Sequence, residues 1–167
     1  MGSWFWVCWF IIQRIEMNEK KNLTIEETFA LAVQNHKKNN LQVAKNLYKT
    51  ILKTNPNYAG VNYNLGITFK ELEEYQKAIS CYEKAIQINP NYADAHNNLG
   101  NILQELKELQ KAKSCYEKLL NLDPTYKKGY SSYGYLLLKI SQHNKGLTYI
   151  RKGDGVIRFT QKDVKIV

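Results

Sequence analysis

The sequence lacks the residue patterns that build metal sites, disulfide-bonded scaffolds and common active sites. It contains three cysteines and three histidines in 167 residues. No two cysteines form a C-x-x-C pair, and none has a metal-ligand spacing to a histidine. P-loop, G-x-G-x-x-G, H-E-x-x-H and paired-carboxylate motifs are also missing. These absences predict no catalytic residue, no metal and no cofactor, and a reduced, cytoplasmic setting.

Hydrophobic runs long enough to cross a membrane are missing as well. The apolar run at residues 4–12 has nine residues, whereas a spanning helix needs about twenty. No Lys or Arg precedes it and no A-x-A cleavage site follows, so it does not resemble a secretory signal. Three interpretations of residues 1–16 stay open: a segment at a membrane interface, a cover for an apolar end of the fold, or a translated upstream stretch. The last, with Met17 as the start, is favoured because Thr24 and Glu27 then open a helix with capping-box spacing.

Acidic residues are scarce in the last quarter of the chain. The formal net charge is +9, and residues 127–167 contain nine Lys/Arg but two Asp/Glu, a net +7. The first 126 residues contain fifteen against thirteen, a net +2. This asymmetry indicates either a solvated lysine-rich end or a surface for an acidic partner. The twelve tyrosines would suit base stacking, but several fall at positions explained by packing, which argues against nucleic-acid binding.

The few prolines recur at a fixed interval. Pro56, Pro90 and Pro124 are each 34 residues apart, a period typical of helix–turn–helix repeats. The stretches "NPNYAGVNYNLG" and "NPNYADAHNNLG" agree at eight of twelve places. Proline cannot continue a helix, so each one marks the end of a repeat. The chain therefore divides into blocks 25–58, 59–92, 93–126 and 127–160.

Other positions of the 34-residue block also recur in phase. Position 7 holds Leu31, Leu65, Leu99 and Tyr133; position 8 holds Ala32, Gly66, Gly100 and Gly134; position 20 holds Ala44, Ala78, Ala112 and Gly146; position 24 holds Tyr48, Tyr82, Tyr116 and Ile150. The small residues let helices approach closely, and the large ones fill the space between neighbours. The pattern predicts helices near 25–38, 41–54, 59–72, 75–88, 93–106, 109–122, 127–140 and 143–152.

This combination of leucine, glycine, alanine, tyrosine and proline resembles the tetratricopeptide (TPR) repeat family, strongly over 25–126 and partly over 127–152. The resemblance implies an all-α, right-handed superhelix of antiparallel helix pairs, with three full repeats and a degenerate fourth. Residues 1–24 would form an N-terminal extension and 25–152 the repeat domain. Residues 153–167 would be a basic tail or a junction to a further domain, with a short extended piece at 155–160.

Stacked repeats make a concave groove lined by their first helices, and asparagine is repeated on this side. An amide has one acceptor and two donors, so it can bond a peptide backbone without regard to side-chain identity. Asn64 and Asn98 resemble the asparagine ladder of the TPR superhelix in O-linked N-acetylglucosamine transferases; the alternative is that both are merely solvated. The predicted function is the binding of an extended peptide in this groove. The predicted site residues are Asn64, Asn98, Tyr63, Asn97, Asn101, Lys128 and Tyr135.

Other functions were weighed against this one. The carboxylate clamp of co-chaperone TPR domains needs basic residues that neither register supplies, which argues against that partner. The chain could instead recruit substrates for a larger enzyme, such as a glycosyltransferase or an oxygenase. Because no polar capping helix follows the fourth repeat, self-association through uncapped ends is a third hypothesis. His96 is expected to be a packing or groove residue, and Cys81 and Cys115 half-buried thiols.

Overall fold

Eight α-helices and a β-hairpin make up the described part of the chain. The computed structural model describes residues 23–155, 157–159 and 164–166. The helices are α2 (Ile25–Lys37), α3 (Leu41–Thr54), α4 (Ala59–Glu71), α5 (Tyr75–Ile88), α6 (Ala93–Glu105), α7 (Leu109–Leu122), α8 (Lys127–Lys139) and α9 (His143–Asp154). β1 (Ile157–Phe159) pairs antiparallel with β2 (Val164–Ile166). The all-α prediction is confirmed, and β1 is the extended piece predicted at 155–160. The interpretations of residues 1–16 concern a segment outside the described residues.

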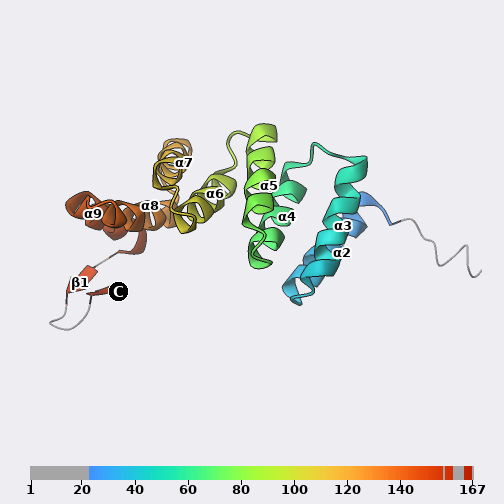
Figure 1. Cartoon of the computed structure of the whole chain (residues 1–167), viewed down its shortest axis with the longest axis horizontal. Helices are drawn as coiled ribbons and strands as arrows, with labels where there is room; N and C mark the ends of the chain where they lie inside the picture. Colours follow the sequence, from blue (N-terminus) through green and yellow to red (C-terminus); the bar gives the residue numbers. More distant parts are fainter. Residues whose placement is uncertain (1–22, 156, 160–163, 167) are drawn as a thin grey trace, which may run out of the picture.

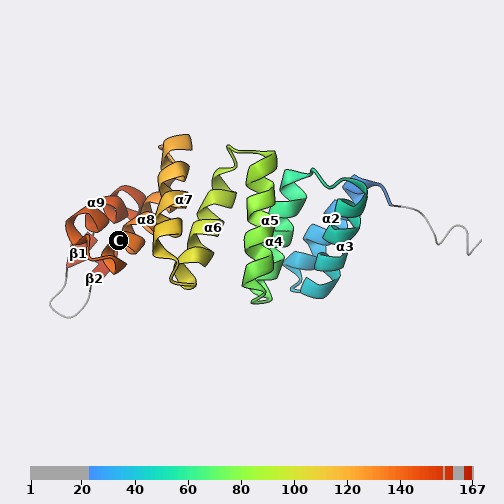
Figure 2. The same ribbon diagram turned by 45° about the horizontal axis from the view of Figure 1, so that its top comes forward.

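The helices form four antiparallel pairs that follow one another along the long axis of the molecule (Figure 1). Within each pair a first helix (α2, α4, α6 or α8) packs on a second helix (α3, α5, α7 or α9). Each second helix except α9 also contacts the first helix of the next pair. β1 contacts α9, so the hairpin lies beside the last pair, as a turned view also shows (Figure 2).

The turn within each pair explains why the first helices end one residue earlier than predicted. After α6, Lys107 adopts the left-handed conformation, with φ 62°. Its N–H donates to the Gln104 carbonyl at 3.1 Å, and the Glu108 N–H donates to the Leu103 carbonyl at 2.8 Å. These two bonds form a Schellman motif, which satisfies the last carbonyls of the helix. The equivalent residues of the other pairs, also at positive φ, are Asn39, Glu73 and Ser141.

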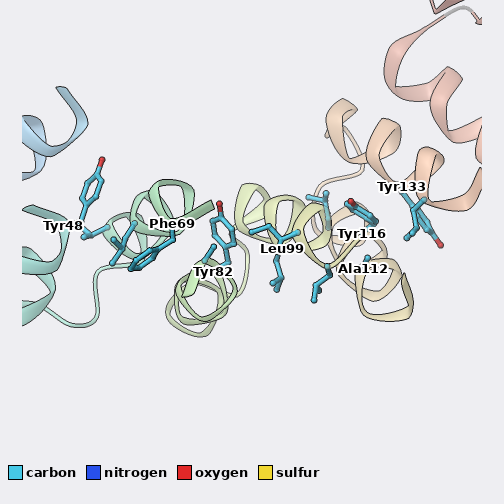
Figure 3. Close-up of a cluster of buried hydrophobic side chains, with 14 of the residues drawn as sticks. Tyr48, Phe69, Tyr82, Leu99, Ala112, Tyr116 and Tyr133 are labelled. Atoms are coloured by element: carbon cyan, nitrogen blue, oxygen red, sulfur yellow. The ribbon is translucent and has the colours of Figure 1, made fainter. Parts of the chain in front are cut away.

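Glycine in the first helices allows direct contact with a tyrosine of the second helix. A Cβ added to Gly66 or Gly100 would lie 2.7 Å from the Cε1 atom of Tyr82 or Tyr116, respectively. Both tyrosines are fully buried, and with Tyr48 and Tyr133 they belong to a row of packed side chains along the array (Figure 3). The recurrence of glycine and tyrosine therefore reflects interlocking packing within each repeat.

The fourth pair is more compact than its sequence suggested. Gly146 replaces the alanine of the other repeats, and a Cβ there would lie 2.9 Å from the Gly134 carbonyl oxygen. The substitution thus lets α8 and α9 approach through their backbones. α9 also runs two residues beyond the predicted end, to Asp154, and stops where Gly155 adopts φ 94°.

The α2 end of the array begins with a capped helix and exposes polar residues. At the start, Thr24 caps α2 through the predicted capping box, with reciprocal bonds to Glu27. Leu31 is 37% exposed, whereas its equivalents Leu65 and Leu99 are buried, because no described helix packs over α2. Three nearby positions of α2 hold polar residues where α4 has buried ones. They are Glu27, Gln34 and Asn35, equivalent to Val61, Thr68 and Phe69.

Candidate functional site: the first-helix surface

The first helices lie side by side and are bonded to one another across the repeats. His36 Nε2 of α2 is 2.8 Å from Glu71 Oε2 of α4, and Lys70 Nζ of α4 is 3.7 Å from Glu105 Oε1 of α6. We call the side of α2, α4, α6 and α8 that carries positions 2, 5, 6, 9, 12 and 13 of each repeat the first-helix surface. On α6 it comprises Asp94, Asn97, Asn98, Asn101, Gln104 and Glu105.

The structure places Asn64 and Asn98 at equivalent positions of α4 and α6, both half-buried. Asn64 Nδ2 donates to the Gly60 carbonyl of its own helix at 2.8 Å. Asn98 Nδ2 donates to the Tyr63 hydroxyl oxygen at 3.2 Å, which joins α6 to α4. Each amide therefore already donates one hydrogen bond within the array. The Oδ1 atom of each amide accepts no hydrogen bond from a described residue.

Tyr63, which accepts the bond from Asn98, is itself packed against two other tyrosines. Its ring lies 4.8 Å, between centroids, from the ring of Tyr92 and 5.9 Å from that of Tyr82. Burial, together with the nearby Asp94 carboxylate, raises the pKa of Tyr63 to about 12. The hydroxyl stays protonated at neutral pH, so it can donate one hydrogen bond while it accepts the bond from Asn98.

Asn97 is more buried, and Asn101 more strongly bonded within the fold, than the sequence predicted. Asn97 is only 6% exposed, and its Oδ1 is buried without a partner. Asn101 Oδ1 accepts a hydrogen bond from the Tyr116 hydroxyl at 2.7 Å. Asn101 therefore has a structural bond to the second helix α7, in addition to its place on the first-helix surface.

Lys128 and Tyr135 lie apart from the asparagines, on α8. Lys128 is exposed and has no ion pair within the described residues. Tyr135 is 41% exposed, and its hydroxyl lies 3.5 Å from Asp154 Oδ2. Burial and the Asp154 carboxylate raise the pKa of Tyr135. The predicted site residues thus share one surface but not one contact cluster.

The prediction did not single out the charged residues at positions 12 and 13. These are the residues that bond one first helix to the next, from His36 to Glu71 and from Lys70 to Glu105. The signal was present in the sequence, because each basic residue lies 35 positions before an acidic one. Residues 35 apart occupy adjacent positions of neighbouring repeats, which stacking brings together.

The acidic side chains of the first-helix surface are largely engaged inside the array. Glu71 and Glu105 pair with His36 and Lys70, and Asp94 accepts a hydrogen bond from the Tyr126 hydroxyl. Asp154, at the end of α9, accepts from Ser131. Their negative charge is therefore partly neutralised or bonded, while basic residues of α8 project into solvent.

A separate cleft of about 440 Å³ lies on the opposite side of α6. The residues that line it include Ile86 of α5, Leu103 of α6 and Cys115 of α7. In the preceding repeat, the place of Leu103 is taken by Phe69, whose ring lies within 6 Å of the ammonium groups of Lys45, Lys49 and Lys77. Positions 4, 7 and 11, which line the cleft, point about 170° away from the first-helix surface.

His96 and the two described cysteines have structural roles. His96 Nε2 donates to the Pro90 carbonyl at 3.0 Å, as Asn62 Nδ2 does to the Pro56 carbonyl at 3.4 Å one repeat earlier. Burial lowers the pKa of His96. Cys81 and Cys115 are free and half-buried, and burial raises the pKa of each thiol to about 11, which makes them poor nucleophiles.

The described residues contain neither a metal-binding cluster nor a membrane-spanning helix. No group of three His, Cys, Asp or Glu side chains within 23–155 is arranged to hold a metal ion. None of the helices α2 to α9 has both the length and the apolar character of a membrane span.

Family models of known repeats match the centre of the chain in overlapping segments. A tetratricopeptide repeat model matches residues 47–80, a TPR repeat model residues 68–107 and another tetratricopeptide repeat model residues 93–126. The last of these segments coincides with the block 93–126, whereas the other two begin within α3 and within α4. Residues 47–126 thus match tetratricopeptide repeats. On α4 and α6, which lie within this segment, the first-helix surface corresponds to the side that lines the concave groove of stacked repeats.

Solved structures of MamA and PilF share the fold. A crystal structure of MamA aligns with a TM-score of 0.76 at 24% identity, over 83% of this chain and 81% of that one. MamA 41-end from Desulfovibrio magneticus RS-1 aligns at 0.71 and 21% identity, over 77% and 73%. PilF of Pseudomonas aeruginosa aligns at 0.75 and 23% identity, over 84% of this chain and 65% of that one. At these identities the likeness shows the fold alone. A search of curated proteins gave no match.

Proposed function

We propose that the first-helix surface binds an extended segment of a partner protein. The TPR fold typically serves protein–protein interaction, and the observation that carries the finer proposal is the pair Asn64 and Asn98. They occupy equivalent places on adjacent first helices, and the amide oxygen of each accepts no hydrogen bond within the described array. A peptide backbone presents N–H and C=O groups at regular intervals, which suits regularly repeated amides.

The surroundings of the pair favour a peptide over a small molecule. Tyr63 supplies an aromatic wall with a protonated hydroxyl. Asn97, which is nearly enclosed, and Asn101, which is bonded to Tyr116, border the pair on α6. The exposed Lys128 and Tyr135 extend the polar surface on α8. An elongated polar row with few enclosed walls matches an extended chain better than a compact ligand, which prefers a concave apolar pocket.

A direct test is the capture of peptides from a random extended-peptide pool by the full chain. We expect the Asn64→Ala/Asn98→Ala double variant to lose at least tenfold in affinity at both low and high salt, because neutral hydrogen bonds are weakly screened. The matched control is Asn46→Ala/Asn121→Ala, which removes two exposed asparagines from the second helices α3 and α7. Equal loss in the control, or no loss in the double variant, would contradict the proposal.

A second proposal is that copies of the chain associate with one another. Leu31 and Val43 are 37% and 48% exposed at the α2/α3 end, which would suit contact with another copy. The polar residues Glu27, Gln34 and Asn35 at the same end work against close apolar packing. Light scattering of the full chain over a hundredfold concentration range separates the two cases. The hypothesis of a substrate-recruiting segment of a larger enzyme rests on resemblance, and no described residue adds to it.

A further inference from the structure

The pairs that join position 12 of one first helix to the next first helix do not continue from α6 to α8. At position 12, His36 and Lys70 each pair with an acidic residue of the next repeat. The next residue in this series, Gln104, would face Lys139, but its Oε1 is buried without a partner. At position 5, Tyr63 bonds Asn98 of the next repeat, whereas Asn97 Oδ1 has no partner. Both unpaired amides lie on α6, two turns apart.

A buried polar atom without a partner is unfavourable, and binding can recover that free energy if the group gains a hydrogen bond. Both amides lie at the edge of α6 that faces α8. α6 and α8 contact each other directly, and Asn97 is nearly enclosed there. Gln104 is half-buried, so it is the unpaired amide at this boundary to which a ligand could supply a hydrogen bond.

The fourth repeat supplies charge to the same place. Helices α8 and α9 carry six Lys/Arg and one Asp, and none of these basic residues has an ion pair with a described residue. The Asp, Asp154, is already bonded to Ser131 and Tyr135. Lys128 and Lys139 lie in the first and last turns of α8, both exposed, and are separated by about 16 Å along its axis. They flank a polar strip that contains Ser132 and Tyr135.

We propose that an acidic extended segment of a protein partner binds across the α6/α8 boundary, with carboxylates at Lys128 and Lys139 and a backbone N–H group at Gln104. This proposal rests on the proposed peptide-binding function and names the chemistry of the partner. Side chains of an extended chain alternate between its two sides. A segment that runs along the array, across α8, therefore directs neighbouring acidic side chains to opposite lysines.

A nucleic acid is the other anionic partner to consider, and the geometry favours the peptide. Single-stranded nucleic acids need exposed aromatic rings on which bases stack. On α8, Tyr133 is buried, and among the large hydrophobic residues of α8 and α9 only Tyr135 is markedly exposed. The unpaired amide oxygen of Gln104 instead matches a peptide N–H group.

The test measures binding of the full chain to two dye-labelled decapeptide pools by fluorescence anisotropy. The pools share random positions drawn from Ala, Val, Thr and Tyr, and differ only in two adjacent central residues, Glu-Glu or Gln-Gln. We expect the Glu pool to bind about tenfold more tightly at 50 mM NaCl, and less so at 300 mM NaCl because salt screens exposed charges. Lys128→Gln/Lys139→Gln should remove most of this preference. The control Lys53→Gln/Lys118→Gln removes the same charge from α3 and α7 and should change affinity less than twofold.

Gln104→Met provides a second readout that a purely structural residue would not give. It removes the unpaired oxygen, so we expect an unchanged or raised melting temperature together with weaker binding of the Glu pool. Equal affinity for both pools would overturn the acidic-segment proposal and leave the peptide-binding function standing. Failure of both pools to bind would count against both. An equal loss in the two lysine double variants, or displacement of the peptides by an oligo-dT with higher affinity, would also overturn it.

Discussion

Tyr116 donates its hydroxyl hydrogen to Asn101 Oδ1 at 2.7 Å, and the two preceding repeats have no counterpart of this bond. The residue equivalent to Asn101 is Ile67 in the second repeat and Val33 in the first. The hydroxyls of Tyr82 and Tyr48 are accordingly buried without a partner. The same packing position of tyrosine thus has this hydrogen bond in one repeat and lacks it in the two preceding repeats.

This difference predicts opposite effects of the same substitution. Tyr116→Phe should lower the free energy of unfolding by about 1 kcal/mol, because Asn101 loses its donor. Tyr82→Phe should leave the free energy of unfolding unchanged or raise it, because it removes a buried hydroxyl that has no partner. Urea denaturation of the two variants measures the contrast. Similar destabilisation of both would show that ring packing alone determines these positions.

The glycines of the first helices make a second matched pair. Gly100→Ala should lower the free energy of unfolding by about 1–3 kcal/mol, since its Cβ would lie 2.7 Å from Tyr116 Cε1. Gly60→Ala should raise it by about 0.5–1 kcal/mol, because the new Cβ meets Tyr58 at 3.6 Å and alanine favours the helix. Thermal melts followed by circular dichroism distinguish the two. A stabilising Gly100→Ala would rule out the interlocked packing described for this repeat.

His96 predicts a pH dependence of stability. Its pKa is lowered from the model-peptide value of 6.5 by burial, so the unfolded chain binds more protons than the folded one below about pH 6.5. Stability should therefore be full above that pH and fall as the pH falls through it. His96→Asn copies Asn62 of the preceding repeat, which bonds the proline carbonyl without a titrating group. We expect the variant to lose this part of the dependence between pH 7 and 5.5; an unaltered pH profile would assign it to other groups.

The left-handed residue of the turns gives a further prediction. Lys107 has φ 62°, a conformation that is strained for residues with a Cβ and relaxed for glycine. Lys107→Gly should raise the free energy of unfolding by up to about 1 kcal/mol. Lys107→Ala, which keeps the Cβ, is the control and should not show this gain. Chemical denaturation measures both, and equal stability of the two variants would contradict the explanation.

The repeat itself could be predicted from sequence, because the prolines, glycines and tyrosines report local constraints that each repeat obeys by itself. Pro90 ends a helix wherever it is placed, and Gly100 faces Tyr116 within one helix pair. The helix bounds therefore agreed with the prediction to within two residues.

The details of the first-helix surface depend on neighbours and were harder to predict. Asn64 and Asn97 look equally suitable in the sequence, yet one is half-buried with a free oxygen and the other is nearly enclosed. The cleft beside Cys115 is lined by Leu103, at the position that Phe69 occupies in the preceding repeat; finding it requires knowledge of what each side chain packs against. Only the charged pairs 35 residues apart offered a usable signal.

The central claim is that partners bind the first-helix surface, and NMR mapping tests it most directly. The ¹⁵N-labelled full chain would be titrated with the enriched peptide while side-chain amide signals are followed. We predict shifts of the Asn64, Asn98 and Gln104 amides, with those of Asn46 and Asn121 unchanged. Shifts confined instead to residues around the cleft between α5 and α7, such as Ile86 and Cys115, would contradict the account and move the binding site to the opposite side of the array.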